Sequence, residues 1–264
     1  MNNIILLTQK DKKKLGRYLK RHRLSALFLY PELTRDGSEN VRHFAITDDS
    51  GDIYSVLSLF DSGLAMLTGS NVCFSGFNPI LRDLKDNFLL YRQYQALPDN
   101  ISELKKEDLM LCRDSVGEIT PDPRVKEKIP RSYIHRLTDL KLSYEEEYWR
   151  YKTDEIHRVQ FAEIISKKIK NGQLFIIEQG KIIAGSGMIE IETEHCCLLG
   201  SIYIIPEFRK RGMGKILTAY IVSSILRKKK LPVLTVDPEN INAIGIYRDL
   251  GFKKVSEMFL GEIL

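Results

Sequence analysis

The stretch from Ile202 to Lys215 constrains this chain more than any other, because it predicts a strand, a tight turn and a helix in immediate succession. Its strand is apolar and rich in isoleucine up to Pro206, which cannot continue a hydrogen-bonded ladder. A helix is expected to begin near Met213, because the apolar residues after it recur at helical spacing. Any fold of this chain must therefore place a helix N-terminus shortly after a buried strand.

The turn in this stretch is basic and contains two glycines, Gly212 and Gly214. A helix N-terminus leaves backbone N–H groups unpaired and carries partial positive charge, and glycine lets an anion approach that backbone closely. Full charges are added by four side chains: Arg209, Lys210, Arg211 and Lys215. The pattern predicts a cradle for a pyrophosphate group. The alternative is an ordinary strand-to-helix turn with surface cations.

Two other phosphate-binding loops do not fit this turn. A Walker loop is excluded because no Gly-Lys-Ser or Gly-Lys-Thr closes the motif, and the Gly-x-Gly-x-x-Gly of a Rossmann loop is missing.

Length and composition fit a folded protein with one large domain or two modest ones. The chain has 264 residues, of which 43% are hydrophobic and 28% charged. No apolar run approaches the roughly 20 residues that span a bilayer. The apolar segment from Ile4 to Leu7 is too short for a signal peptide. We therefore expect a cytoplasmic protein without membrane contact.

The net charge of +5 comes largely from two local runs, Lys12–Lys14 and Arg227–Lys230. The second run follows the helix after the basic turn, where cations suit the helix dipole. Both runs are interpreted as solvated faces, because no zinc spacing and no basic patch with interleaved aromatic residues accompanies them. No nucleic-acid partner is expected.

The cysteines suggest neither a metal site nor a disulfide framework. They are Cys73, Cys112, Cys196 and Cys197. The adjacent pair suits neither a simple disulfide nor a metal knuckle, so the expected role is apolar filling of a strand and no metal is expected. A cysteine nucleophile stays open as an alternative. His195 is a poor partner for its neighbour Cys196, because neighbours in a strand point to opposite faces.

The chain divides into two mixed α/β halves. Residues 113–131 carry three prolines, many charges and few large apolar groups, which is typical of a linker. The expected domains are residues 1–115 and 132–264, with the linker over 116–131. The halves resemble each other faintly, since both run hairpin, strand, turn, helix and strand. In the first half the turn is Phe74–Phe77, which has no basic residue.

The expected elements follow from hydrophobic periodicity and from the glycine, proline and polar residues that bound helices and strands. In the first half they are a helix capped by Thr8 and running to about His22, strands at 41–47, 53–60, 64–68, 88–95 and 108–113, a helix opened by Asn78-Pro79 and running to Leu84, and a weak helix at 101–105. In the second half they are helices at 144–152, 159–169 and 240–250, and strands at 174–178, 181–192, 196–205, 232–237 and 252–263.

A second motif follows the basic turn, separated from it by one helix and one buried strand. It is Asn240-x-x-Ala243-x-x-x-Tyr247-x-x-x-Gly251-Phe252. Ala243 and Tyr247 share a helix face, and Gly251 ends the helix. Taken alone, Tyr247 fits an ordinary core tyrosine.

Together the two motifs resemble the GNAT superfamily of acyl-CoA-dependent N-acetyltransferases. Arg209-x-x-Gly212-x-Gly214 is similar to the CoA pyrophosphate motif of that family, and Asn240 to Phe252 is similar to its last conserved helix. The motifs occur in the family's order and spacing, and the resemblance covers about residues 132–264. More loosely, the whole chain resembles bacterial tandem proteins with a degenerate GNAT-like N-terminal domain.

The resemblance implies an α+β (mixed α/β) GNAT fold with a mostly antiparallel twisted sheet flanked by helices. Two parallel strands, Cys196–Ile205 and Pro232–Asp237, would splay apart at its centre. Acetyl-CoA would be the co-substrate, with its pantetheine arm in the gap and no metal involved. The implied cofactor-binding residues are Ile202, Tyr203 and Ile204 for pantetheine, Arg209, Lys210, Arg211, Gly212, Met213, Gly214 and Lys215 for the pyrophosphate, and Asn240 for the cofactor arm.

The resemblance also implies the reaction, which is transfer of acetyl to a primary amine of a small molecule or peptide by direct attack. Tyr247 would protonate the leaving thiolate, since tyrosine titrates near ~10. A backbone N–H near Ile204 would stabilise the oxyanion. The general base is not evident, and the candidates are Glu190, Glu192, Glu194, His195 or a water relay.

Two alternatives stay open. One is a non-catalytic CoA-binding regulatory protein whose N-terminal half binds a partner, and the other is a transferase that uses another acyl-CoA. Because its turn lacks a basic residue, the N-terminal half is expected to be structural, either capping the acceptor side or forming a homodimer surface.

Overall fold

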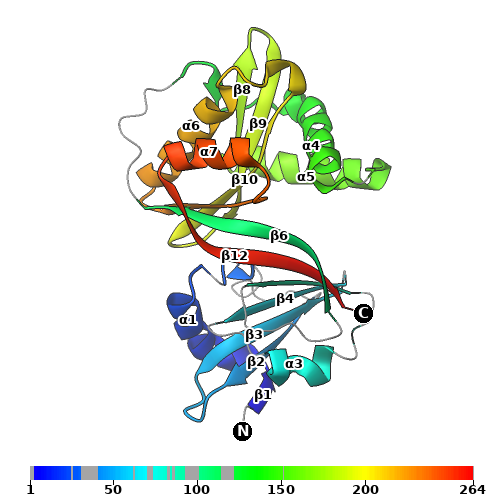
Figure 1. Ribbon diagram of the computed structural model, residues 1–264, viewed down its shortest axis with the longest axis vertical. Helices are drawn as coiled ribbons and strands as arrows, with labels where there is room; N and C mark the ends of the chain where they lie inside the picture. The colour runs from blue at the N-terminus through cyan, green and yellow to red at the C-terminus, as the bar shows by residue number, and fades with distance from the viewer. Residues whose placement is uncertain are drawn as a thin grey trace. The chain divides into compact units, whose positions relative to one another are not determined.

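The computed structural model describes residues 3–24, 26–30, 41–61, 63–69, 74–81, 84, 87–92, 101–113, 122–150 and 152–263. Its contacts divide the chain into two compact units (Figure 1). Unit 1 comprises Met1–Leu109, Thr235–Glu239 and Lys254–Leu264, and unit 2 comprises Met110–Leu234 and Asn240–Lys253. The domain limits expected from the sequence stay a prediction. The contacts add that the C-terminal residues pack within unit 1.

Unit 1 is a sheet in the order β1-β2-β3-β4-β5-β12-β6. Its strands are β1 (Asn3–Leu6), β2 (Val41–Thr47), β3 (Ile53–Phe60), β4 (Leu64–Gly69), β5 (Asn87–Arg92), β6 (Ile101–Cys112) and β12 (Phe252–Ile263). β4 and β5 run parallel, whereas β12 pairs antiparallel with β5, with Ile263 opposite Asn87. Two of its helices are α1 (Lys12–Arg21) and α3 (Phe74–Leu81). The last strand of the chain therefore belongs to the sheet of the N-terminal unit.

Several expectations for unit 1 are confirmed. The strands predicted at 41–47 and 53–60 have those bounds. Thr8 caps the first helical turn, since its side chain accepts from the Lys10 N–H and Asp11 accepts from the Thr8 N–H at 3.0 Å. Strand β1 was not expected, because four residues give too short a pattern.

Two expectations for unit 1 are wrong. Residues 101–105 begin the long strand β6, because its charged side chains pair across to β12. Lys106 lies 2.7 Å from Glu257, and Lys254 lies 2.6 Å from Asp108. The helix expected from Asn78 begins at Phe74 instead and holds Pro79 inside it.

Burial explains why α3 tolerates its proline. Phe77 and Leu81, one turn apart, are fully buried in the core of unit 1. Packing of this face stabilises the helix although Pro79 removes one backbone donor.

Unit 2 is a sheet in the order β11-β10-β9-β8-β7. Its elements are β7 (Val125–Lys126), α4 (Ile134–Trp149), α5 (Glu155–Lys170), β8 (Leu174–Gln179), β9 (Ile182–Glu192), β10 (Cys196–Ile204), α6 (Met213–Arg227), β11 (Leu231–Val236) and α7 (Ile241–Asp249). β10 and β11 are parallel, and the pairs from β10 to β7 are antiparallel. The mixed α/β fold, with a mostly antiparallel sheet and the parallel pair β10 and β11, is therefore confirmed.

Helices cover both faces of the unit 2 sheet, with α4 and α5 on one face and α6 on the other (Figure 1). Alternation along β8 produces this arrangement. Leu174 and Ile176 pack with Leu137 of α4 and Ile165 of α5, whereas the ring of Phe175 meets Tyr220 of α6. The sheet is thus buried on both sides, which leaves its strand ends for chemistry.

The expected elements of unit 2 are present, with different bounds in the helical region. α4 begins ten residues before the expected start at Tyr144, and Val125–Lys126 of the predicted linker is a strand that pairs with β8. Part of that linker, residues 116–121, lies outside the described residues. Within the part of the chain that the structure describes, no helix is long and apolar enough to cross a membrane.

We predict that Ile263→Ala lowers the free energy of unfolding of unit 1 by about 2–5 kcal/mol, because Ile263 is fully buried in the core of that unit. Val255→Ala on the same strand is the control, since Val255 is 38% exposed and should change stability by less than about 1 kcal/mol. Denaturant titration with hydrogen exchange over residues 41–69 measures both. Equal losses for the two variants would contradict the placement of β12.

Candidate functional site

The parallel strands β10 and β11 pair over only three positions. Cys196 lies opposite Leu231, Cys197 opposite Pro232 and Leu198 opposite Val233. Both strands continue beyond this point, to Ile204 and Val236, and the described residues show no further pair between them. The expected splay is therefore present. It leaves main-chain groups of β10 facing a gap.

A bulge accompanies the splay. Between Gly200 and Tyr203, β10 advances three residues while its partner β9 advances two, from Met188 to Ser186. Ser201 has a left-handed backbone with φ of 48°, which is uncommon for a residue with a side chain. Such bulges bend a strand and often lie beside functional sites.

Glycine in β9 permits the close approach of the bulged strand. A Cβ atom at Gly185 would lie 2.4 Å from the carbonyl oxygen of Tyr203. β10 therefore leans toward β9 as it leaves β11.

The basic turn has the geometry of an anion-binding loop. Lys210 and Gly212 both have left-handed backbones, with φ of 59° and 76°, and α6 begins at Met213. Within the described residues, no acceptor bonds the N–H groups of residues 210–215. These amides, and the positive end of α6, form a concave donor set of the kind that binds phosphates.

The four cations of this turn have separate roles, which the sequence did not reveal. Arg209 donates from Nε to the Ile204 carbonyl at 2.8 Å and from Nη2 to Glu147 at 2.7 Å. This bonding lowers the pKa of the Glu147 carboxyl. Arg209 therefore fixes the turn to β10 and α4.

The other three cations, Lys210, Arg211 and Lys215, are more available to bind an anion. Lys215 pairs with Asp249 of α7 at 2.7 Å, but that pair is half exposed. Arg211 lies over the Phe208 ring at 5.4 Å. Neither Lys210 nor Arg211 has a carboxylate partner among the described residues. Two full charges thus remain beside the free amides.

Asn240 and Tyr247 lie on α7, as expected. The Asn240 side-chain oxygen accepts from the Ala243 N–H at 3.1 Å, so this residue caps the helix while its amide NH2 stays available to a ligand. Tyr247 is partly buried against the Phe252 ring, with centroids 5.9 Å apart. Burial raises the pKa of Tyr247 to about 12, so its hydroxyl is protonated at neutral pH. No described group hydrogen-bonds that hydroxyl.

The candidate bases are separated by their partners. Glu192 accepts from Lys230 at 2.8 Å and from Gln173 at 3.1 Å. Burial opposes its ionisation, but these bonds and the charges of Lys228 and Lys230 lower the pKa of Glu192 to about 2. A carboxylate held this way is a poor proton acceptor at neutral pH.

The remaining candidates differ in their surroundings. Glu194 lies 3.5 Å from His195 in the exposed turn after β9. Glu190 instead accepts a hydrogen bond from Ser201 Oγ on the bulge, at 2.7 Å. Of the four candidates, only Glu190 is thus bonded to the bulged part of β10.

The described cysteines are buried and form no disulfide, in agreement with apolar filling. Burial raises the pKa of Cys197 to about 12, and a thiol that stays protonated is a poor nucleophile. Cys73 lies outside the described residues. Within the described part of the chain, no group of three or more His, Cys, Asp or Glu residues could hold a metal ion.

Sequence reasoning missed a buried polar cluster under the bulge. Lys141 of α4 donates to Ser201 Oγ at 2.6 Å and pairs with Glu145 at 2.5 Å. The only signal in the sequence was the i, i+4 spacing of Lys141 and Glu145, which occurs on many exposed helices. Nothing in the pattern linked Lys141 to a serine on a distant strand.

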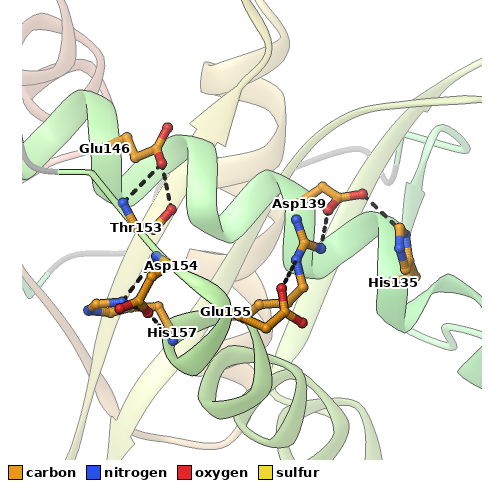
Figure 2. Close-up of polar contacts among 8 residues, drawn as sticks. His135, Asp139, Glu146, Thr153, Asp154, Glu155 and His157 are labelled. Carbon is orange, nitrogen blue, oxygen red and sulfur yellow. Dashed lines mark hydrogen bonds and ion pairs between the residues drawn. The ribbon is translucent and has the colours of Figure 1, made fainter.

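A hollow of about 430 Å³ lies where α4 meets α5. Its acidic side chains are paired within the chain. Thr153 donates to Glu146, His157 contacts Asp154, and Asp139 contacts both His135 and Arg158 (Figure 2). These contacts brace the junction of the two helices and account for its acidic groups without a ligand.

Comparison with known proteins gives one family and a shared fold. Residues 135–252 match the model of the acetyltransferase (GNAT) family. No curated protein matches the chain. Among solved structures, a GCN5-related N-acetyltransferase from Sphaerobacter thermophilus aligns with a TM-score of 0.67 at 12% identity, over 99% of this chain and 96% of that one.

Two further structures are similar over both units. A GNAT-family acetyltransferase from Colwellia psychrerythraea aligns with a TM-score of 0.66 at 9% identity, over 99% of this chain and 100% of that one. A tandem GNAT protein from the clavulanic acid biosynthesis pathway aligns with a TM-score of 0.60 at 14% identity, over 99% and 98%. At these identities the likeness concerns the fold alone.

We predict that Glu192→Gln destabilises unit 2 by about 1–3 kcal/mol at pH 7, because it removes the charge that pairs with Lys228 and Lys230. The folded pKa of about 2 lies below the usual 4.5. The stabilisation is therefore complete well above the usual pKa and disappears as the pH falls through the folded value.

Urea unfolding of wild type and variant at several pH values between 7 and 2.5 measures this difference. Glu163→Gln on the exposed face of α5 is the control. A difference that stayed constant down to pH 2.5 would count against the ion pairs as its cause.

Proposed function

We propose that this protein moves acetyl from acetyl-CoA to a primary amine. The match of residues 135–252 to the acetyltransferase (GNAT) family supports acyl transfer, which is the coarser assignment. The acceptor is a small molecule or a peptide. The proposal rests on the site in unit 2. Unit 1 is proposed to be structural, either capping the acceptor side or forming a homodimer surface.

One observation carries the proposal, namely that the free amides of residues 210–215 lie at the end of the strand that splays from its neighbour. A CoA molecule joins a diphosphate to an amide-bearing pantetheine arm. The amides and the positive end of α6 suit the diphosphate. The unpaired main chain of β10 suits the arm, because an extended chain with amides can add to an exposed strand.

The main chain near Ile204 supports this arrangement in detail. The Ile205 N–H bonds to Ala184 of β9, and successive N–H groups of a strand point to opposite sides. The Ile204 N–H is therefore directed toward the gap. Its carbonyl oxygen already accepts from Arg209, so the N–H is the group left for the arm or for an oxyanion.

Tyr247 is proposed as the general acid. In direct transfer, the amine nitrogen bonds to the thioester carbonyl carbon, the C–S bond breaks and the thiolate takes a proton. Burial keeps the pKa of Tyr247 at about 12, so its hydroxyl carries that proton throughout the neutral range. With no described hydrogen-bond partner, the hydroxyl can turn toward the sulfur.

Two alternatives use the same site. A non-catalytic protein would bind CoA for regulation, and another transferase would use a different acyl-CoA. Release of CoA thiol over a panel of amines separates catalysis from binding. Competition between acyl-CoAs determines the preferred donor.

We predict that Gly212→Asp weakens CoA binding at least about tenfold, since it sets a carboxylate beside the free amides. Gly172→Asp is the matched control, because Gly172 also has a left-handed backbone, with φ of 62°, and open space around it. Calorimetry with CoA and with pantetheine measures both variants. Equal binding of CoA by the two variants, or equal affinity for pantetheine and CoA, would reject the cradle.

We expect Tyr247→Phe to lower kcat by about 10²–10⁴-fold while sparing CoA affinity, because it removes only the proton donor. Tyr220→Phe, in helix α6, is the control for loss of a tyrosine hydroxyl. Steady-state thiol release and calorimetry measure the two effects. An unchanged kcat would exclude Tyr247 as the acid.

A further inference from the structure

Glu190 occupies a bulge of its own on β9. Leu198 lies opposite Ile191, and the next residue of β10, Leu199, lies opposite Ile189. Glu190 is therefore the extra residue, without a partner on β10. A bulge of this kind re-aims a side chain that regular pleating would direct elsewhere.

A lysine fixes this bulge from the adjoining helix. Lys168 of α5 donates to the main-chain oxygens of Ile189 and Glu190, at 2.6 and 2.7 Å. Burial lowers the pKa of Lys168, and the charges of Glu190 and Glu192 oppose that shift. Burying a charged lysine costs free energy unless it is hydrogen-bonded. The two bonds from Lys168 therefore indicate that the bulge conformation is specifically stabilised.

The carboxyl group of Glu190 reaches across the neighbouring strand. A Cβ atom at Gly200 would lie 2.5 Å from both Cδ and Oε1 of Glu190. Only glycine therefore admits the carboxyl at this point. The group rests against the main chain of β10, beyond the last pair with β11 and two residues before Ile202.

The carboxyl group is also held from the side. Ser201 Oγ donates to Glu190 Oε1 at 2.7 Å and accepts from Lys141 at 2.6 Å, and Lys141 pairs with Glu145. Ser201 makes these bonds from a left-handed backbone conformation, which is strained for a residue with a side chain. Within the described residues, Oε2 of Glu190 accepts no hydrogen bond.

The exposed carboxylate of Glu190 thus lies beside the splayed part of β10. The two bulges, Gly200 and the buried cluster around Lys141 position it, with Oε1 hydrogen-bonded and Oε2 free. We propose that Glu190 is the general base that takes the proton from the acceptor amine, with Ser201 and Lys141 as positioning residues. This inference rests on the proposed function and supplies the group that the sequence left unassigned.

The step balances as follows. An ammonium N–H proton passes to Glu190 Oε2, and the freed lone pair forms the C–N bond at the thioester carbonyl. The C–S bond breaks and the thiolate takes the proton of Tyr247. The nitrogen loses its second proton as the amide forms, and that proton restores Tyr247 through solvent, while the proton on Glu190 leaves to solvent. The charged groups that face Glu190 are Lys168 from α5, Lys141 and Glu145 from α4, and Glu192 on its own strand.

Glu190→Gln tests the proposal, because the amide still accepts from Ser201 but cannot take a proton. Glu190 is exposed, so the variant should fold. We expect kcat/KM to fall by about 10²–10⁴-fold and the acidic limb of its pH profile to disappear, with CoA affinity unchanged. Glu163→Gln, a distant exposed carboxyl on α5, should retain the wild-type profile.

Lys141→Met and Ser201→Ala test the positioning roles. Both should lower kcat/KM less than Glu190→Gln and should keep an acidic limb at a displaced pH, since the base itself remains. Lys141→Arg should restore the wild-type limb. A purely structural role would lower activity without moving the limb, and would overturn this part of the proposal.

The outcomes separate this inference from the function on which it rests. An active wild type whose acidic limb survives in Glu190→Gln would overturn the inference alone. Loss of the acidic limb in Glu192→Gln, with the limb kept in Glu190→Gln, would identify Glu192 as the base instead. A folded wild type that releases no CoA thiol with any amine would overturn the inference and the proposed transfer together, while calorimetry with CoA would still report on the cradle.

Discussion

The parting of β10 from β11 is the constraint on which the site in unit 2 depends. Parallel strands ordinarily satisfy each other's main-chain groups, and here that pairing stops after Leu198 and Val233. The bulge at Ser201 and the glycines of β9 draw β10 toward the opposite neighbour. A strand with unsatisfied donors then leads directly into a helix N-terminus with unsatisfied donors. Both sets of unpaired donors suit one elongated ligand in which an amide-bearing arm is joined to a diphosphate.

The sequence predicted this arrangement where the physical rules are local. Pro206, the left-handed turn at Gly212 and the apolar face after Met213 act within a few residues, so strand, turn and helix were found in place. The bounds of β2 and β3 were equally local, since alternation and a polar turn define a hairpin. The family motif added Tyr247 by order and spacing.

The sequence could not predict what depends on distant contacts. Residues 101–105 looked weakly helical, but they begin β6, whose Lys106 and Asp108 pair with side chains of β12 some 150 residues further along the chain. Lys141 looked like one half of a surface pair, whereas it is bonded beneath a strand bulge. Arg209 stays a predicted phosphate ligand, but its local pattern did not show that it also bonds to Ile204 and to the distant Glu147. In each case the structure shows a contact with a residue that is distant in sequence, which a local pattern cannot predict.

The position of β12 has a consequence for how the protein is made. Because β12 follows β5 by about 160 residues in the chain, β5 stays without that neighbour until residues 252–263 have been synthesised. Domains usually fold in order as they emerge. Here the N-terminal half can finish only after the C-terminal half exists. A nascent chain that stalls before Phe259 would therefore expose an open sheet edge, the kind of surface that chaperones protect and that aggregation exploits.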